Sequence, residues 1–140
     1  MSDNKQNNVK RPGPGRKDSS AKAAGVPQAP HPQFGTVIEL EKALEAKFNE
    51  ENLAKAVGIC WNKYAWYEEH EDPSAGDELY RQTCEQTDSW CEAYYRTVDK
   101  LKTFLGYDAD TAFALPEIAA VMDRNGFEDK DGVWQRKKKQ

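Results

Sequence analysis

The sequence predicts an all-α protein: a helix-turn-helix followed by a long oligomerisation helix, behind a disordered N-terminal tail. Three observations support this fold class. Apolar residues recur at spacings of three and four between residues 36 and 105. Ala54 and Gly58 stand at the spacing that a helix-turn-helix requires. Five of the seven prolines precede residue 35. We divide the chain into a disordered basic tail (1–34), a helix-turn-helix unit (35–72), a long self-associating helix (73–109), and a short helix with a basic tail (110–140).

The tail combines proline, glycine and charged residues without apolar periodicity, so it cannot build a core. Residues 10–17 place basic side chains around an extended Gly/Pro segment. Two interpretations are open for this segment. It is either a hook for the minor groove of DNA or a plain basic linker.

The first helix is predicted to begin at Thr36 and to end near Asn49. Thr36 and Glu39 have the spacing of a capping box, in which each side chain binds a free backbone amide of the other residue. One apolar face follows, made of Val37, Leu40, Leu44 and Phe48.

The helix-turn-helix is predicted from Ala54, which permits close helix crossing, and from Gly58, which tolerates a positive φ in the turn. Residues 50–57 would form the supporting helix and residues 61–69 the recognition helix. The interior positions would be Leu53, Val57, Ile59, Tyr64 and Tyr67. The alternative is one amphipathic helix that tolerates Gly58 at a cost of about 1 kcal/mol.

The long helix is predicted to start at the Ser74–Asp77 cap, after Pro73, and to reach Leu105. Its apolar or near-apolar positions alternate at spacings of four and three: Tyr80, Cys84, Thr87, Cys91, Tyr94, Val98, Leu101 and Leu105. This heptad seam predicts a helical partner in the same chain or in another copy. We assign self-association to all of these residues except Thr87, and an ordinary core helix is the alternative.

Gly106 should end the long helix, and Pro116 fits the first turn of a short helix that runs to Arg124. Asn125 and Gly126 form a stop signal for that helix. Phe127 and Trp134 are then expected to pin the C-terminal segment onto the body.

The formal charge of −4 is unevenly distributed. Residues 1–35 carry six basic and two acidic residues, residues 36–133 carry ten basic and twenty-two acidic ones, and residues 136–139 are all basic. An acidic body with basic ends favours a polyanion or an acidic protein surface as partner of the ends. An alternative is that the charged tails only keep the chain soluble.

The sequence predicts neither an enzyme nor a cofactor. We find no phosphate-binding glycine loop and no nucleophile motif. Asp129 and Asp131 match part of a calcium loop, but Phe127 and Lys138 occupy positions that need acids, so no metal is expected. The three cysteines form no C-x-x-C pair, which favours buried thiols in a reducing cytosol. No run is apolar enough for a membrane span.

The order of elements resembles the small terminase subunit of tailed bacteriophages, over roughly residues 36–131. The resemblance is carried by the basic Gly/Pro/Arg tail, Thr-Val-Ile-Glu-Leu-Glu-Lys-Ala-Leu at 36–44, the predicted helix-turn-helix and long helix, Ala-Phe-Ala-Leu at 112–115, and Asn-Gly-Phe-Glu-Asp-Lys at 125–130. The chain departs from the family pattern at Pro116, where the family would have Lys, and at Phe127, which stands near the place of a Trp. Extra residues also separate Leu115 from Asn125.

The resemblance implies a DNA-packaging factor of the host cytoplasm. Such a factor forms a homo-oligomeric ring, recognises double-stranded viral DNA and presents it to the large terminase subunit. From the residues themselves we assign DNA contacts to Asn62, Lys63 and Trp66 on the predicted recognition helix. Trp61 could stack there or belong to the core. Arg11, Arg16 and Lys17 would add phosphate attraction, whereas Glu68 and Glu69 would repel phosphate.

Two other functions stay open. One is a dimeric helix-turn-helix transcriptional regulator. The other is a protein-binding module whose acidic helical body never contacts DNA. The mass of the oligomer separates a packaging ring from a regulator, and salt-dependent DNA binding separates both from the protein-binding module.

Overall fold

The computed structural model describes residues 34–138. The predicted tail and its DNA contacts Arg11, Arg16 and Lys17 lie outside the described residues. The described elements are the helices α1 (Val37–Ala46), α2 (Glu50–Glu69), α3 (Asp77–Phe104) and α4 (Leu115–Arg124), the 3-10 turn η1 (Pro73–Ala75), and the strands β1 (Phe127–Lys130) and β2 (Val133–Arg136). The predicted all-α class is therefore confirmed in its helical content, and a small β-hairpin is added to it.

The start of α1 confirms the predicted capping box. The Thr36 hydroxyl oxygen accepts a hydrogen bond from the Glu39 amide at 3.2 Å, and Glu39 Oε1 accepts from the Thr36 amide at 3.3 Å. Val37, Leu40 and Leu44 are buried, as their spacing predicted. The helix ends at Ala46, so Phe48 lies beyond it and is half exposed.

The predicted helix-turn-helix is wrong. Residues 50–69 form one continuous helix, α2, that passes through Gly58. The physical reason is tertiary packing at Gly58, where an added Cβ would lie 3.3 Å from Met122 Cε and 3.3 Å from Trp134 Cβ. The glycine therefore permits close approach of the C-terminal segment. The alternative of a single helix that tolerates Gly58 is the one confirmed.

The connection between α2 and α3 also differs in detail from the prediction. Asp72 supplies the capping carboxylate, and its Oδ1 accepts a hydrogen bond from the Ser74 amide at 3.0 Å. Ser74 lies within η1, and α3 begins at Asp77 after Gly76, whose φ is +111°. The helix then ends at Phe104, within a residue of the predicted end.

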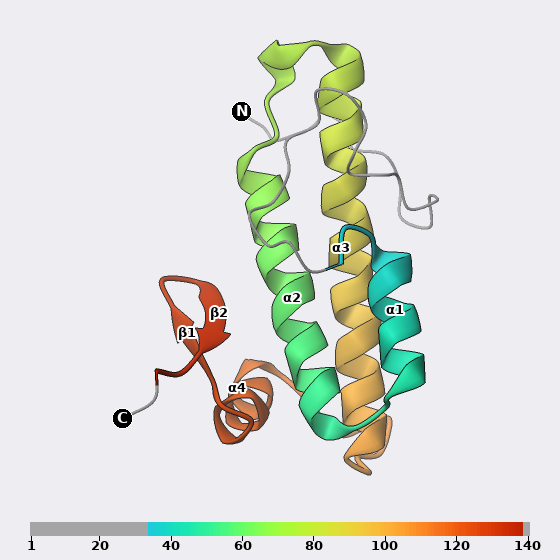
Figure 1. Cartoon of the computed structure of the whole chain (residues 1–140), viewed down its shortest axis with the longest axis vertical. Helices are drawn as coiled ribbons and strands as arrows, with labels where there is room; N and C mark the ends of the chain where they lie inside the picture. Colours follow the sequence, from blue (N-terminus) through green and yellow to red (C-terminus); the bar gives the residue numbers. More distant parts are fainter. Residues whose placement is uncertain (1–33, 139–140) are drawn as a thin grey trace.

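Helices α2 and α3 pack against each other over most of their length and form the centre of the fold (Figure 1). Helix α1 packs on the same pair, while α4 and the β-hairpin lie on the opposite side of α2 (Figure 1). The largest buried side chains are Trp90, Tyr67, Leu53 and Leu101. One hydrophobic core thus joins α1, α2, α3, α4 and β1.

The heptad seam of α3 is a core face within one chain, as the ordinary-core alternative proposed. Cys84, Thr87, Tyr94 and Leu101 are buried, whereas Tyr80, Cys91, Val98 and Leu105 are only half-buried. The buried face is rotated relative to the seam, because Trp90 is fully buried while its neighbour Cys91 is not. We assigned Cys84, Tyr94 and Leu101 to contacts between copies. In this fold their own chain covers them, so these side chains are not available for such contacts.

The C-terminal segment contains two strands that the sequence analysis did not predict. Helix α4 confirms the short helix, with Pro116 in its first turn. After Gly126, β1 and β2 pair antiparallel, with Lys130 opposite Val133. Asp131 and Gly132 close the hairpin with φ values of +56° and +84°. Positive φ at both turn residues matches the right-handed twist of hairpin strands.

Candidate functional site

The β-hairpin is held against α2 by hydrogen bonds from two side chains of that helix, Asn62 and Trp61. Asn62 Nδ2 donates to the Trp134 carbonyl at 2.8 Å, and the Trp134 amide donates to Asn62 Oδ1 at 2.9 Å. Both backbone groups of Trp134 are therefore satisfied by Asn62 on the edge of β2. Trp61 Nε1 adds a third bond, at 3.0 Å, to the Gly132 carbonyl.

A second anchor joins the start of α2 to the end of α4. Arg124 Nε lies 2.8 Å from Glu50 Oε2, and Asn125 Nδ2 donates to the same oxygen at 2.7 Å. These hydrogen bonds favour the charged carboxylate and lower the pKa of Glu50 below its usual 4.5. The bond from Arg124 has the larger effect, and the bond from Asn125 the smaller. The pair stabilises the fold above that pH, and its contribution is lost as the pH falls through the lowered pKa.

A groove of about 250 Å³ lies between these anchors, where α2 faces the hairpin. It is lined by two cations, two amides and apolar or aromatic groups: Lys55, Gly58, Ile59, Asn62, Phe127, Trp134, Gln135 and Arg136. None of the lining residues in the described part of the chain carries a carboxylate. The Arg136 guanidinium lies 4.5 Å from the centre of the Phe127 ring, which places its charge over the aromatic wall.

A second cavity, of about 200 Å³, lies between α1 and α2 and shares Lys55 and Ile59 with the groove. Its remaining lining is mainly apolar: Phe34, Leu40, Ala43, Leu44, Asn52 and Ala56. Lys55 thus stands on the ridge of α2 that separates the two hollows.

The three predicted DNA contacts on α2 do not form one free surface. The Asn62 amide is used to hold β2, as described above. Lys63 is only 3% exposed, and its ammonium lies 5.2 Å from the centre of the Trp90 ring. Trp66 is half-buried and stacks on His70, with ring centroids 3.8 Å apart. The assignment of Asn62 and Lys63 to DNA contacts is therefore not met, because internal packing occupies both side chains. Trp61, for which stacking and core were both open, packs against the core and binds the hairpin.

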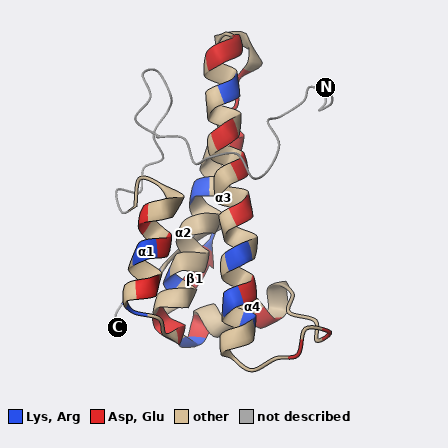
Figure 2. Cartoon of the chain, turned by 90° about the vertical axis from the view of Figure 1, so that its right-hand side faces the viewer, with Lys and Arg blue, Asp and Glu red and all other residues tan. Residues whose placement is uncertain are grey.

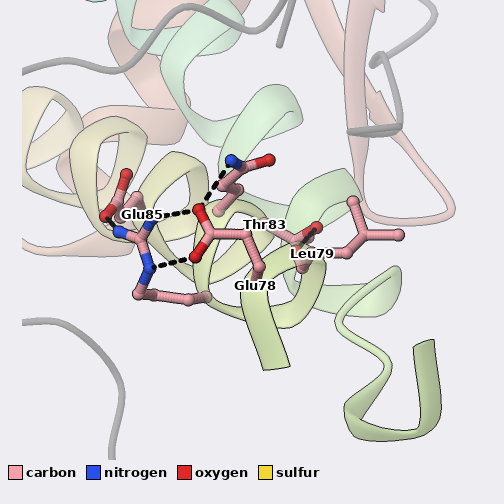
Figure 3. A network of polar contacts seen from close by, with 6 residues as sticks. Glu78, Leu79, Thr83 and Glu85 are labelled. Carbon is pink, nitrogen blue, oxygen red and sulfur yellow. Dashed lines mark hydrogen bonds and ion pairs between the residues drawn. The ribbon is translucent and has the colours of Figure 1, made fainter. Parts of the chain in front are cut away.

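Acidic residues are concentrated at the end of the α2–α3 pair where the two helices connect (Figure 2). At the start of α3, Arg81 bridges Glu78 and Glu85, and Gln82 donates to Glu78 at 2.9 Å (Figure 3). The network is an intrahelical one, since these residues are spaced by one helical turn. Within residues 34–138, no group of three or more potential ligands could hold a metal ion.

The opposite end of the bundle exposes aromatic and aliphatic side chains. Phe48 and Phe104 meet edge to face at 5.7 Å, with 49% and 45% of their surfaces exposed. Tyr107 packs on Phe113 at 5.5 Å. Leu115, at the start of α4, is 67% exposed. Large apolar side chains that stay this exposed favour contact with another surface.

Cys60 offers little nucleophilic character. Burial raises the pKa of Cys60 to about 12, so its thiol stays protonated at neutral pH. Cys84 is also buried.

Comparisons with protein-family models, curated proteins and solved structures find no match to this chain. None of the helices that the structure describes is long and apolar enough to span a membrane.

Proposed function

We propose that this chain is a non-catalytic DNA-packaging factor that resembles a terminase small subunit, acts as a homo-oligomer, and presents viral DNA to the large subunit in the host cytoplasm. The separation of charge carries this proposal. Residues 36–133 hold twenty-two acidic and ten basic residues, whereas both ends of the chain are basic. Double-stranded DNA is a dense polyanion, so it is attracted to the ends and repelled by the body.

The proposal moves the DNA contacts away from α2. Lys63 is buried and Asn62 binds the hairpin, so neither reads a base in this conformation. Phosphate contacts fall instead to Arg11, Arg16 and Lys17, and to the basic run that begins at Arg136. Binding of this kind is weakly sequence-dependent and gains strength when several copies act together.

The proposal is tested by titrating full-length protein with duplex DNA at several salt concentrations. A variant that carries Arg11→Gln, Arg16→Gln and Lys17→Gln should bind more weakly and with a flatter salt dependence, by a slope of about 0.9 for each lost phosphate contact. The matched control removes three exposed charges from the body, at Lys42, Lys47 and Lys130. Equal losses in both variants, or wild-type protein that ignores DNA at low salt, would contradict the proposal.

Light scattering supplies the second arm of this test. A packaging ring requires a molar mass several times the 15.9 kDa of the chain. A monomer at micromolar concentration would remove the ring from the proposal.

A protein-binding module with an acidic helical body is the second candidate. It is favoured by the exposed side chains of Phe48, Phe104, Tyr107 and Leu115 at one end of the bundle. The regulator alternative rested on the helix-turn-helix, and residues 50–69 form a single helix instead. Failure of wild-type protein to bind duplex DNA at low salt would favour the protein-binding module.

A further inference from the structure

We propose that the groove between α2 and the β-hairpin binds a small aromatic carboxylate. The site goes beyond the proposed DNA packaging: it uses none of the tail residues before residue 35, although it shares Arg136 with the basic run at the C-terminal end. It is built from Lys55 and Arg136, which would hold the carboxylate, and from Phe127 and Trp134, which would contact the ring.

Charge gives the groove its preference for an anion. The surrounding body is strongly acidic, yet the groove is lined by two cations and by no described carboxylate. Within residues 34–138, the Lys55 ammonium has neither a hydrogen bond nor an ion pair. Arg136 Nη1 donates to the Asn125 carbonyl at 3.3 Å, and the guanidinium lies 3.6 Å from Glu51, with both charged side chains more than half exposed. An ion pair this exposed contributes little to the stability of the fold, so the guanidinium can turn from Glu51 to a stronger partner.

The walls of the groove favour a flat ring. Ile59 and Phe127 are buried, and Trp134 is half-buried beside them. Gly58 lets Trp134 pack directly on α2, since a Cβ there would lie 3.3 Å from Trp134 Cβ. The volume of about 250 Å³ lies below the range of drug-sized pockets and suits one or two fused rings.

The donors favour a carboxylate over a phosphate. Phosphate sites in proteins commonly use free backbone amides at a helix N-terminus. Lys55 and Asn62 instead lie in the interior of α2, where the backbone amides are bonded within the helix. The arginine fork matches the planar shape of a carboxylate, and the lysine adds a second positive charge beside it.

The proposal is tested by calorimetry and amide NMR on the full chain with 2-naphthoate, and with the uncharged 2-naphthamide as matched probe. We expect saturable binding of 2-naphthoate, with shifts at Trp134 and Gln135, and about tenfold weaker binding of the amide, as for the loss of one charge-assisted hydrogen bond. Lys55→Met keeps the apolar stem of the side chain but removes its charge. It should weaken the binding of 2-naphthoate about tenfold.

Lys47→Met is the control variant, because Lys47 is exposed in the α1–α2 connection and does not line the groove. It should bind 2-naphthoate as the wild type does. Equal affinity for acid and amide, an unchanged affinity in Lys55→Met, or shifts confined to the α1–α2 cavity would each overturn the proposal. Thermal unfolding of both variants shows whether a loss of affinity reflects a loss of fold.

Discussion

Lys63 lies inside the α2–α3 interface, with its ammonium over the ring of Trp90. Burial lowers the pKa of Lys63 below its usual 10.5, because removal from water disfavours the charged form. The aliphatic stem of Lys63 packs with the core, and its ammonium is attracted electrostatically by the face of the Trp90 ring. At the residue scale, then, this lysine is packed inside the fold and does not present its charge to a polyanion.

The variant Lys63→Glu should therefore destabilise the protein, because it places a carboxylate at a buried site beside the π-face of Trp90. We expect a loss of about 3 kcal/mol in the free energy of unfolding, measured with urea. Lys42→Glu on the exposed face of α1 reverses the same charge and should change stability little. A Lys63→Glu protein that keeps its stability but loses DNA binding would restore Lys63 as a DNA contact.

At the scale of elements, the C-terminal hairpin is too small to be stable alone, because it has two strands of four residues each. It depends on α2, which supplies the Asn62 amide, the close approach that Gly58 permits and the indole of Trp61. Helix α2 is thus both a core helix and the support of the groove.

Removal of the Asn62 amide should release the hairpin without unfolding the helices. Asn62→Ala loses two hydrogen bonds to Trp134, which together contribute about 2 kcal/mol. Hydrogen exchange should accelerate at residues 127–136 and stay slow in α2 and α3. Asn52→Ala is the control, since the Asn52 amide donates to the Lys47 carbonyl and not to the hairpin. Unchanged exchange at Trp134 in Asn62→Ala would mean that other contacts hold the strand.

At the scale of the whole molecule, the periodic face of α3 is covered within one chain. Leu101 and Trp90 are fully buried, while Tyr95 on the same helix is 66% exposed. A chain that buries its own seam can fold as one copy. Any association of copies must then use side chains that remain exposed.

Leu101→Asp separates a core position from a contact between copies. A charge at this buried position should cost several kcal/mol and abolish cooperative thermal unfolding at every protein concentration. Tyr95→Asp, six residues earlier on α3, should keep the wild-type transition. Circular dichroism and light scattering measure helicity and mass together. A Leu101→Asp protein that stays helical and only falls in mass would place Leu101 between copies.

The local elements were predictable because their signals lie within one turn of the residues that they order. The Thr36–Glu39 capping box, Pro116 in the first turn of α4 and the end of α3 near Leu105 all depend on neighbouring residues. The hairpin carried such a signal too. Asp131-Gly132 is a favoured two-residue hairpin turn.

The sequence by itself thus determined the positions of α1, α3 and α4, the cap of α1 and the segregation of charge. Tertiary structure decided whether Gly58 formed a turn, which face of α3 was buried, and whether Lys63 reached solvent. Each of these depends on a partner distant in sequence, such as Trp134, which lies 72 residues from the Asn62 that binds it. Glycine favours a turn in isolation, but at Gly58 close packing against Met122 and Trp134 outweighs a helix cost of about 1 kcal/mol.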